Sequence, residues 1–224
     1  MVSSGDPKTS NGTANGAGDH DHDHDHDEAG DPEGGLGLAL PEREPPPAAV
    51  AELVAACARF VASKYQVALD GTPDTLSLVD QYVRDAREAV KERPDTLELV
   101  ARAVGVYLGE VFRHAFGAEW RTGGAHDAWR LCFRHVYLAF NPIGMAREAL
   151  TLADAEGWHA HLELDPAERE AIAERLAAMP EVDEEEYYLP STRFDVISGV
   201  VETLRARAEA SGTGEVTFSA EDYD

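Results

Sequence analysis

Apolar residues recur at helical spacing along three segments in the first half of the chain. Within 47–65 they begin at Val50 and follow at i+3, i+4, i+7, i+10, i+11 and i+15, which places them on one face of a helix. The same pattern predicts helices over 73–91 and from Pro94 to just before Gly117. Three amphipathic helices with short connections predict a small bundle.

The pattern changes to β-prone residues in the middle of the chain. Residues 118–122 and 128–140 are rich in Trp, Phe, Tyr, Val and Leu, and the Gly123-Gly124 pair between them is typical of a hairpin turn. The run 158–164 alternates strictly between apolar and polar residues, which predicts a further strand.

Capping residues mark the starts of several helices. Thr72 is expected to cap the second helix, and Asn141 followed by proline to begin a helix over 142–155. A further helix is expected over about 165–179. Ser191 is expected to cap a last helix that runs to about residue 210.

These elements predict an α+β fold in which helices dominate. An N-terminal three-helix unit precedes a small antiparallel β-sheet at about 118–140, and further helices follow. Residues 1–46 lack the apolar residues needed for a core, so we expect an acidic, disordered tail rich in His and Asp. We expect 47–212 to form a single globular domain and 213–224 to form an acidic C-terminal tail.

Charge narrows the classes of partner. The formal net charge is −24, and residues 1–46 hold only eleven of the 43 acidic residues, so the excess extends through the domain. Such a surface repels nucleic acid and anionic membranes and suits a basic protein partner or cations; the alternative is that it serves solubility alone. No run approaches the roughly 18 apolar residues of a spanning helix. Cys57 and Cys132 are interpreted as buried thiols of a cytoplasmic protein.

The N-terminal segment carries four histidines that alternate with aspartates. Neutral imidazoles suit Zn and Ni, and the flanking carboxylates add charge, but a tail without a preformed pocket binds metal loosely. The alternatives are a solvating tail that binds metal only incidentally and a tail that gains positive charge in mild acid. The tail histidines are His20, His22, His24 and His26.

Glu110 and His114 form the second candidate site, one turn apart in the third helix. A Glu–His pair at this spacing can act in acid–base chemistry or supply two metal ligands. The alternative is a structural role, in which Glu110 bonds to Arg113, His114 or a strand and fixes the helix to the sheet.

Three weaker candidates lie in the second half of the chain. His159 and His161 share one face of the predicted strand with Glu163 and are candidate metal ligands; the alternative is a solvent-exposed polar face. Residues 190–195 can present backbone N–H groups and Arg193 to an anion, or can simply begin a helix. The acidic stretch 183–188 is a candidate docking patch for a basic partner, or a solvated loop.

Sequence motifs for nucleophiles, phosphate loops and dinucleotide binding are absent. This favours a soluble, non-enzymatic interaction or regulatory module without a resident cofactor. Divalent-metal binding or buffering by the tail, with loosely bound Zn or Ni, is the first alternative. An enzyme that uses Glu110 and His114 is the second.

Short motifs indicate a family relationship. The run Leu69-Asp-Gly-Thr-Pro-Asp-Thr-Leu76, followed by Tyr107-Leu-Gly-Glu110 and then Trp120, resembles a family of uncharacterised proteins of actinobacteria and myxobacteria. The resemblance covers about 50–150. It implies a small α+β domain and supplies no activity, ligand or catalytic residue.

Overall fold

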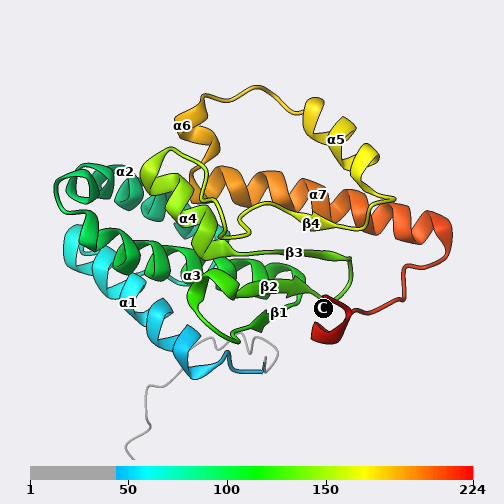
Figure 1. The fold of residues 1–224 in the computed structure, drawn as a ribbon, viewed down its shortest axis with the longest axis horizontal. Coiled ribbons are helices and arrows are strands. Elements are labelled where there is room, and N and C mark those ends of the chain that lie inside the picture. The colour runs from blue at the N-terminus through cyan, green and yellow to red at the C-terminus, as the bar shows by residue number, and fades with distance from the viewer. Residues whose placement is uncertain (1–43, 224) are drawn as a thin grey trace, which may run out of the picture. The chain divides into compact units, whose positions relative to one another are not determined.

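Three helices follow the three apolar stripes at the start of the computed structural model, which describes residues 44–223. They are α1 (Ala48–Tyr65), α2 (Leu76–Glu92) and α3 (Leu97–Phe116), and one 3₁₀ turn precedes each of α2 (Pro73–Thr75) and α3 (Pro94–Thr96). All three lie where the stripes predicted them. Figure 1 shows α3 between α1 and the rest of the molecule, and almost all of its central residues are buried.

The turn before α2 is held by an aspartate rather than by the predicted threonine cap. Thr72 makes no capping bond; its backbone N–H and its hydroxyl both donate to the Asp70 carboxylate, at 2.9 and 2.6 Å. The Thr75 hydroxyl donates to the same oxygen at 3.1 Å. Thr72 occupies the predicted N-cap position before Pro73, but the bonds that organise this turn are made by Asp70.

A four-stranded antiparallel sheet occupies the middle of the chain, in the order β1-β2-β3-β4. Its strands are β1 (Ala118–Arg121), β2 (Arg130–Phe133), β3 (Leu138–Phe140) and β4 (Glu163–Leu164). With seven helices in the described part of the chain, the predicted helix-dominated α+β class is confirmed.

The β1–β2 connection is longer than the predicted Gly-Gly hairpin. The strands pair antiparallel as expected, but the loop between them holds a 3₁₀ turn, His126–Ala128. The Asn141 side-chain amide donates to the carbonyl oxygens of His126 and Asp127 and so fixes this loop. Asn141 also caps α4 (Pro142–Thr151), as predicted, by accepting from the Ile143 N–H at 2.9 Å. The helix ends four residues earlier than the predicted 155, because Leu152 takes a left-handed conformation.

The predicted strand 158–164 is present only at its end. His159 has a φ of 49°, a conformation that interrupts an extended backbone. Trp158 and Ala160 pack beside Gly144 of α4, while His159 and His161 stay exposed. The alternation of burial was therefore predicted correctly, although most of the segment is an irregular loop.

The last three helices are α5 (Arg169–Ala177), α6 (Glu184–Tyr187) and α7 (Pro190–Ser211). In Figure 1, α5, the following loop and α6 form an arch over α7. Leu189, not Ser191, occupies the N-cap position of α7. The Ser191 hydroxyl and N–H instead donate to Asp80 on α2, so its predicted capping role was wrong.

The core lies between α3, α4, α7 and the sheet. Phe112 is at its centre, with ring centroids 5.4 Å from Phe140 and 5.0 Å from Phe194. The C-terminal segment, expected as an acidic tail from 213, also contacts the sheet. The Tyr223 ring stacks on Tyr137 with centroids 4.7 Å apart, and its hydroxyl accepts from the Leu138 N–H. Packing therefore continues beyond residue 212.

Within residues 44–223, no helix combines the length and the apolar character that a membrane span requires.

Candidate functional site

Glu110 and His114 lie together on α3, but Glu110 is fully engaged by other donors. Its carboxylate is 5% exposed and accepts the Trp120 indole N–H at 2.7 Å. Arg113 donates to both carboxylate oxygens, at 2.8 and 2.9 Å. His114 is farther away, with its Nε2 atom 3.6 Å from Oε2.

Gly109 makes the Trp120 contact sterically feasible. A Cβ atom at Gly109 would lie only 2.3 Å from the Trp120 ring, so the indole packs directly on the α3 backbone. The bond from Trp120 to Glu110 thus joins β1 to α3. This geometry favours the structural interpretation of the Glu110–His114 pair over the catalytic one.

The predicted metal ligands His159 and His161 have different neighbours in the structure. The His159 Nδ1 atom lies 3.4 Å from Glu163. His161 is instead grouped with Glu148 and Asp154, whose ligand atoms all lie within 4.8 Å of one another. The tail histidines His20, His22, His24 and His26 lie outside the described residues.

Glu148 and Arg193 form a buried ion pair that sequence reasoning missed. Glu148 lies on α4, Arg193 on α7, and the Arg193 Nη2 atom is 2.7 Å from Oε2 of Glu148. The two residues are 1% and 9% exposed, and burial raises the pKa of Glu148 above its ordinary value. The guanidinium also lies over the Tyr187 ring and donates to the Tyr187 hydroxyl at 3.1 Å.

This pair corrects the expectation that Arg193 presents its charge to an anion. The sequence carried a signal, because Leu189, Arg193 and Ile197 follow one another at four-residue spacing on a buried helix face. A charged residue on such a face requires a buried partner.

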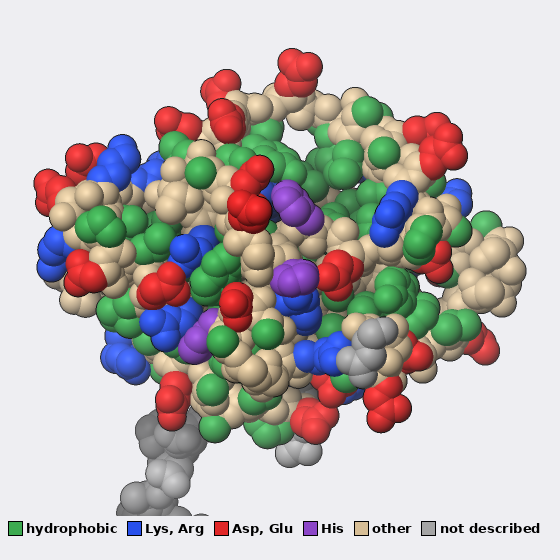
Figure 2. All heavy atoms as spheres, in the orientation of Figure 1, with side chains coloured by type: hydrophobic (Ala, Val, Ile, Leu, Met, Phe, Trp, Pro, Cys, Tyr) green, Lys and Arg blue, Asp and Glu red, His purple; other side chains and the backbone are tan. Residues whose placement is uncertain are grey.

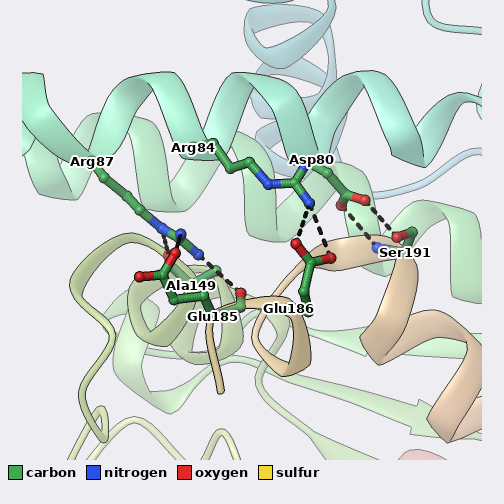
Figure 3. Close-up of polar contacts among 7 residues, drawn as sticks. All are labelled: Asp80, Arg84, Arg87, Ala149, Glu185, Glu186 and Ser191. Carbon is green, nitrogen blue, oxygen red and sulfur yellow. Dashed lines mark hydrogen bonds and ion pairs between the residues drawn. The ribbon is translucent and has the colours of Figure 1, made fainter. Parts of the chain in front are cut away.

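A second polar network fixes α6 and the start of α7 to α2. Figure 3 shows Arg84 donating to both carboxylate oxygens of Glu186, at 2.8 and 3.0 Å. Arg87 reaches the carbonyl oxygen of Ala149 at 2.9 Å and that of Glu185 at 3.2 Å. Two acids of the predicted docking patch 183–188 are therefore used within the fold.

A groove lies between the arch and α7, and we call it the α5–α7 groove. Its volume is about 280 Å³. Figure 2 shows a hollow beneath the arch with hydrophobic side chains inside it. The apolar part of the groove is lined by Leu162, Leu164, Ile172, Leu176, Val196 and Ile197.

The arch combines exposed apolar side chains with unpaired acids. Leu176, Val182 and Tyr187 are 36%, 51% and 38% exposed, and they make up half of the six large apolar side chains exposed within 44–223. Residues 170–186 contain seven acids and one base. Five of these acids make no ion pair with another residue of the described structure: Glu170, Glu174, Glu181, Asp183 and Glu184.

Neither cysteine is poised as a nucleophile. Cys57 and Cys132 are buried free thiols, and burial raises the pKa of each to about 12. Both are therefore protonated at neutral pH.

Comparison with known proteins agrees with the resemblance found in the sequence. The model of a family of unknown function (DUF6278) matches residues 25–129, slightly less than half of the chain. Searches of the curated proteins and of the solved structures each gave no significant match. The matched range ends in the β1–β2 connection, so the α5–α7 groove lies outside the similarity.

Proposed function

We propose that this protein is a non-enzymatic interaction module that docks a basic segment of a protein partner in the α5–α7 groove. The observation that carries the proposal is an apolar groove beneath an arch that bears five unpaired acids and three exposed apolar side chains. Contiguous exposed apolar surface rimmed by polar residues is typical of protein interaction sites.

The size of the groove and the acids of the arch favour a particular kind of ligand. A volume of about 280 Å³ accommodates one or two apolar side chains rather than a drug-sized molecule. Lys or Arg residues that flank those anchors would pair with the unpaired acids of the arch rather than with the groove lining, whose charged residues are Arg169 and Arg193. Charge complementarity of this kind accelerates association and selects among partners.

The α2 network supports the same proposal. Arg84 and Arg87 bind Glu186 and Glu185, which fixes α6 to α2. The neighbouring acids Asp183 and Glu184 make no ion pair with other described residues. A preorganised rim of this kind loses little conformational entropy on binding.

Capture of a partner with and without the groove tests the proposal. Tagged full-length protein, the variant Leu176→Glu and the control Val67→Glu are used as baits in lysate of the native host. Val67 is 43% exposed, in the loop after α1, and does not line the groove. We expect wild type and the control to retain a protein whose cross-links map to α5–α6 through a basic segment, and Leu176→Glu to lose it.

The proposal is wrong if all three baits retain the same proteins equally, or if the cross-links map to the α1–α3 side of the domain.

Both free cysteines are consistent with a reducing compartment, and we propose the cytoplasm as the site of action.

The alternation of His and Asp in residues 19–27 motivates a second proposal, loose binding of Zn or Ni by the tail histidines. Titration of the peptide 15–32 with either metal tests it. Binding no tighter than that of a scrambled, His-depleted peptide would contradict it.

A further inference from the structure

Glu148, Asp154 and His161 bring three metal-binding groups to one edge of the α5–α7 groove. Glu148 belongs to α4, Asp154 to the turn that follows it, and His161 to the loop before β4. One ligand atom from each residue lies within 4.8 Å of the others. Two carboxylates and an imidazole are a ligand set suited to zinc and related divalent ions.

The buried Glu148 carboxylate has one oxygen without a strong donor. Its Oε2 atom accepts from Arg193 at 2.7 Å, but Oε1 receives only the Ala155 N–H at 3.5 Å. That distance is longer than an ordinary N–H···O bond. Glu148 is 1% exposed, so water is excluded from most of its surface, and this long bond is the only one that the described structure gives Oε1. Oε1 can therefore take a further partner. Asp154 offers only acceptor oxygens, and a neutral His161 offers one N–H donor and one nitrogen lone pair that can bind a metal ion.

We propose that Glu148, Asp154 and His161 bind a divalent transition metal ion such as Zn²⁺, with water completing the coordination. Arg193 would hold the Oε2 atom of Glu148 and orient the carboxylate, as outer partners of metal ligands do. The ion would offset the charge of Asp154, which Arg193 does not pair with, and would join α4 to the loops around 154 and 161. This site does not involve the tail histidines, and it shares His161 and Arg193 with the lining of the α5–α7 groove.

The Arg193 guanidinium limits the affinity of this site for a metal ion. Arg193 carries a positive charge on the opposite oxygen of Glu148, and this charge repels a second cation. We therefore expect tighter binding than by scattered surface acids but weaker binding than by a four-ligand structural zinc site.

Zinc binding by the full-length chain tests the proposal when the tail histidines are removed. The parent for this experiment carries His20→Ala, His22→Ala, His24→Ala and His26→Ala, so the tail contributes no imidazole. Calorimetric titration with Zn²⁺ and native mass spectrometry are expected to find one ion per chain. Zn²⁺ is also expected to raise the Tm of this parent.

Three single substitutions in that parent locate the ion. His161→Ala and Asp154→Asn are each expected to weaken Zn²⁺ binding at least tenfold and to abolish the rise in Tm. His159→Ala is the matched control, because His159 is exposed, two residues from His161 and beside Glu163 instead. Glu148 is left intact, because it partners the buried Arg193.

The substituted residues are exposed, so all variants should keep the circular dichroism spectrum of the parent. A parent that binds no Zn²⁺ would overturn the proposal. So would equal binding by the His161→Ala variant, or an equal loss on His159→Ala.

Discussion

Buried charges in this domain are paired between elements that are distant in the sequence. Arg193 meets Glu148, 45 residues earlier, and Ser191 meets Asp80, 111 residues earlier. The apolar stripe around Arg193 indicates that it needs a partner, but helical periodicity cannot say which acid supplies it. Glu110 differs, because its position and a structural alternative were both evident from the spacing on one helix.

Removal of the indole N–H of Trp120 tests the structural role of Glu110. We expect Trp120→Phe to lower the free energy of unfolding by about 1.5–3 kcal/mol through loss of a bond to a charged group, in addition to the loss of ring volume. Trp129→Phe is the matched control, because Trp129 is equally buried and its Nε1 atom has no partner in the described structure. Urea unfolding measures both variants, and equal losses would contradict the role of the bond.

The pKa of Asp85 predicts a link between α1 and α2 that acid breaks. Lys64, the Tyr65 hydroxyl and Gln81 all bind its carboxylate and lower its pKa to about 2. Because the folded pKa lies below the unfolded value, the stabilisation is complete above about pH 4 and is lost as the pH falls toward 2.

The difference in free energy of unfolding between wild type and the Asp85→Asn variant should therefore decrease as the pH falls from about 4 toward 2. A carboxyl NMR titration measures the pKa directly. A normal pKa for Asp85, with a pH-independent difference between the two proteins, would contradict the link.

At the scale of elements, periodic stripes predicted helices reliably and alternation predicted a strand poorly. The stripes of α1, α2 and α3 require a helix, since only that geometry puts residues three and four apart on one face. In 158–164, burial alternates because Trp158 and Ala160 reach Gly144 from an irregular loop. Alternating burial does not itself require an extended backbone, so the burial pattern was right and only Glu163–Leu164 of the predicted strand is extended.

The close approach of α3 and α4 depends on Gly105. A Cβ atom there would lie 2.5 Å from the backbone of Pro142 and Ile143, which cannot move without shifting the start of α4. We expect Gly105→Ala to cost about 1–3 kcal/mol, although alanine favours helix.

Gly199→Ala is the matched control, on α7. Its Cβ would meet only the end of the Arg175 side chain, at 3.4 Å, so we expect a gain of about 0.5–1 kcal/mol from helix propensity. Thermal or urea unfolding measures both variants, and two effects of the same sign would contradict the packing argument.

At the scale of the whole molecule, the groove is assembled from four separate segments, one of which is α6 through Tyr187. Residues 160–164, α5 and α7 each contribute part of its lining. The sequence identified the acids of 183–188 as a candidate docking patch. It could not show that Glu185 and Glu186 bind arginines of α2, or that apolar side chains of the arch are exposed. Both facts depend on tertiary packing.

The described fold begins at Glu44, whose carbonyl oxygen accepts from Arg113 at 3.1 Å. We expect removal of residues 1–43 to leave the Tm and the urea midpoint unchanged, since all the helices and strands that the structure describes lie after that point. A large loss of stability on this truncation would show that the N-terminal segment belongs to the folding unit.

Hydrogen exchange of the protein bound to its captured partner tests the docking account most directly. The account predicts that binding slows amide exchange in α5, α6 and residues 160–164, that high salt weakens the complex, and that Leu176→Glu removes the protection. Protection confined to α1 and α2, with the α5–α7 groove exchanging as in the free protein, would contradict it.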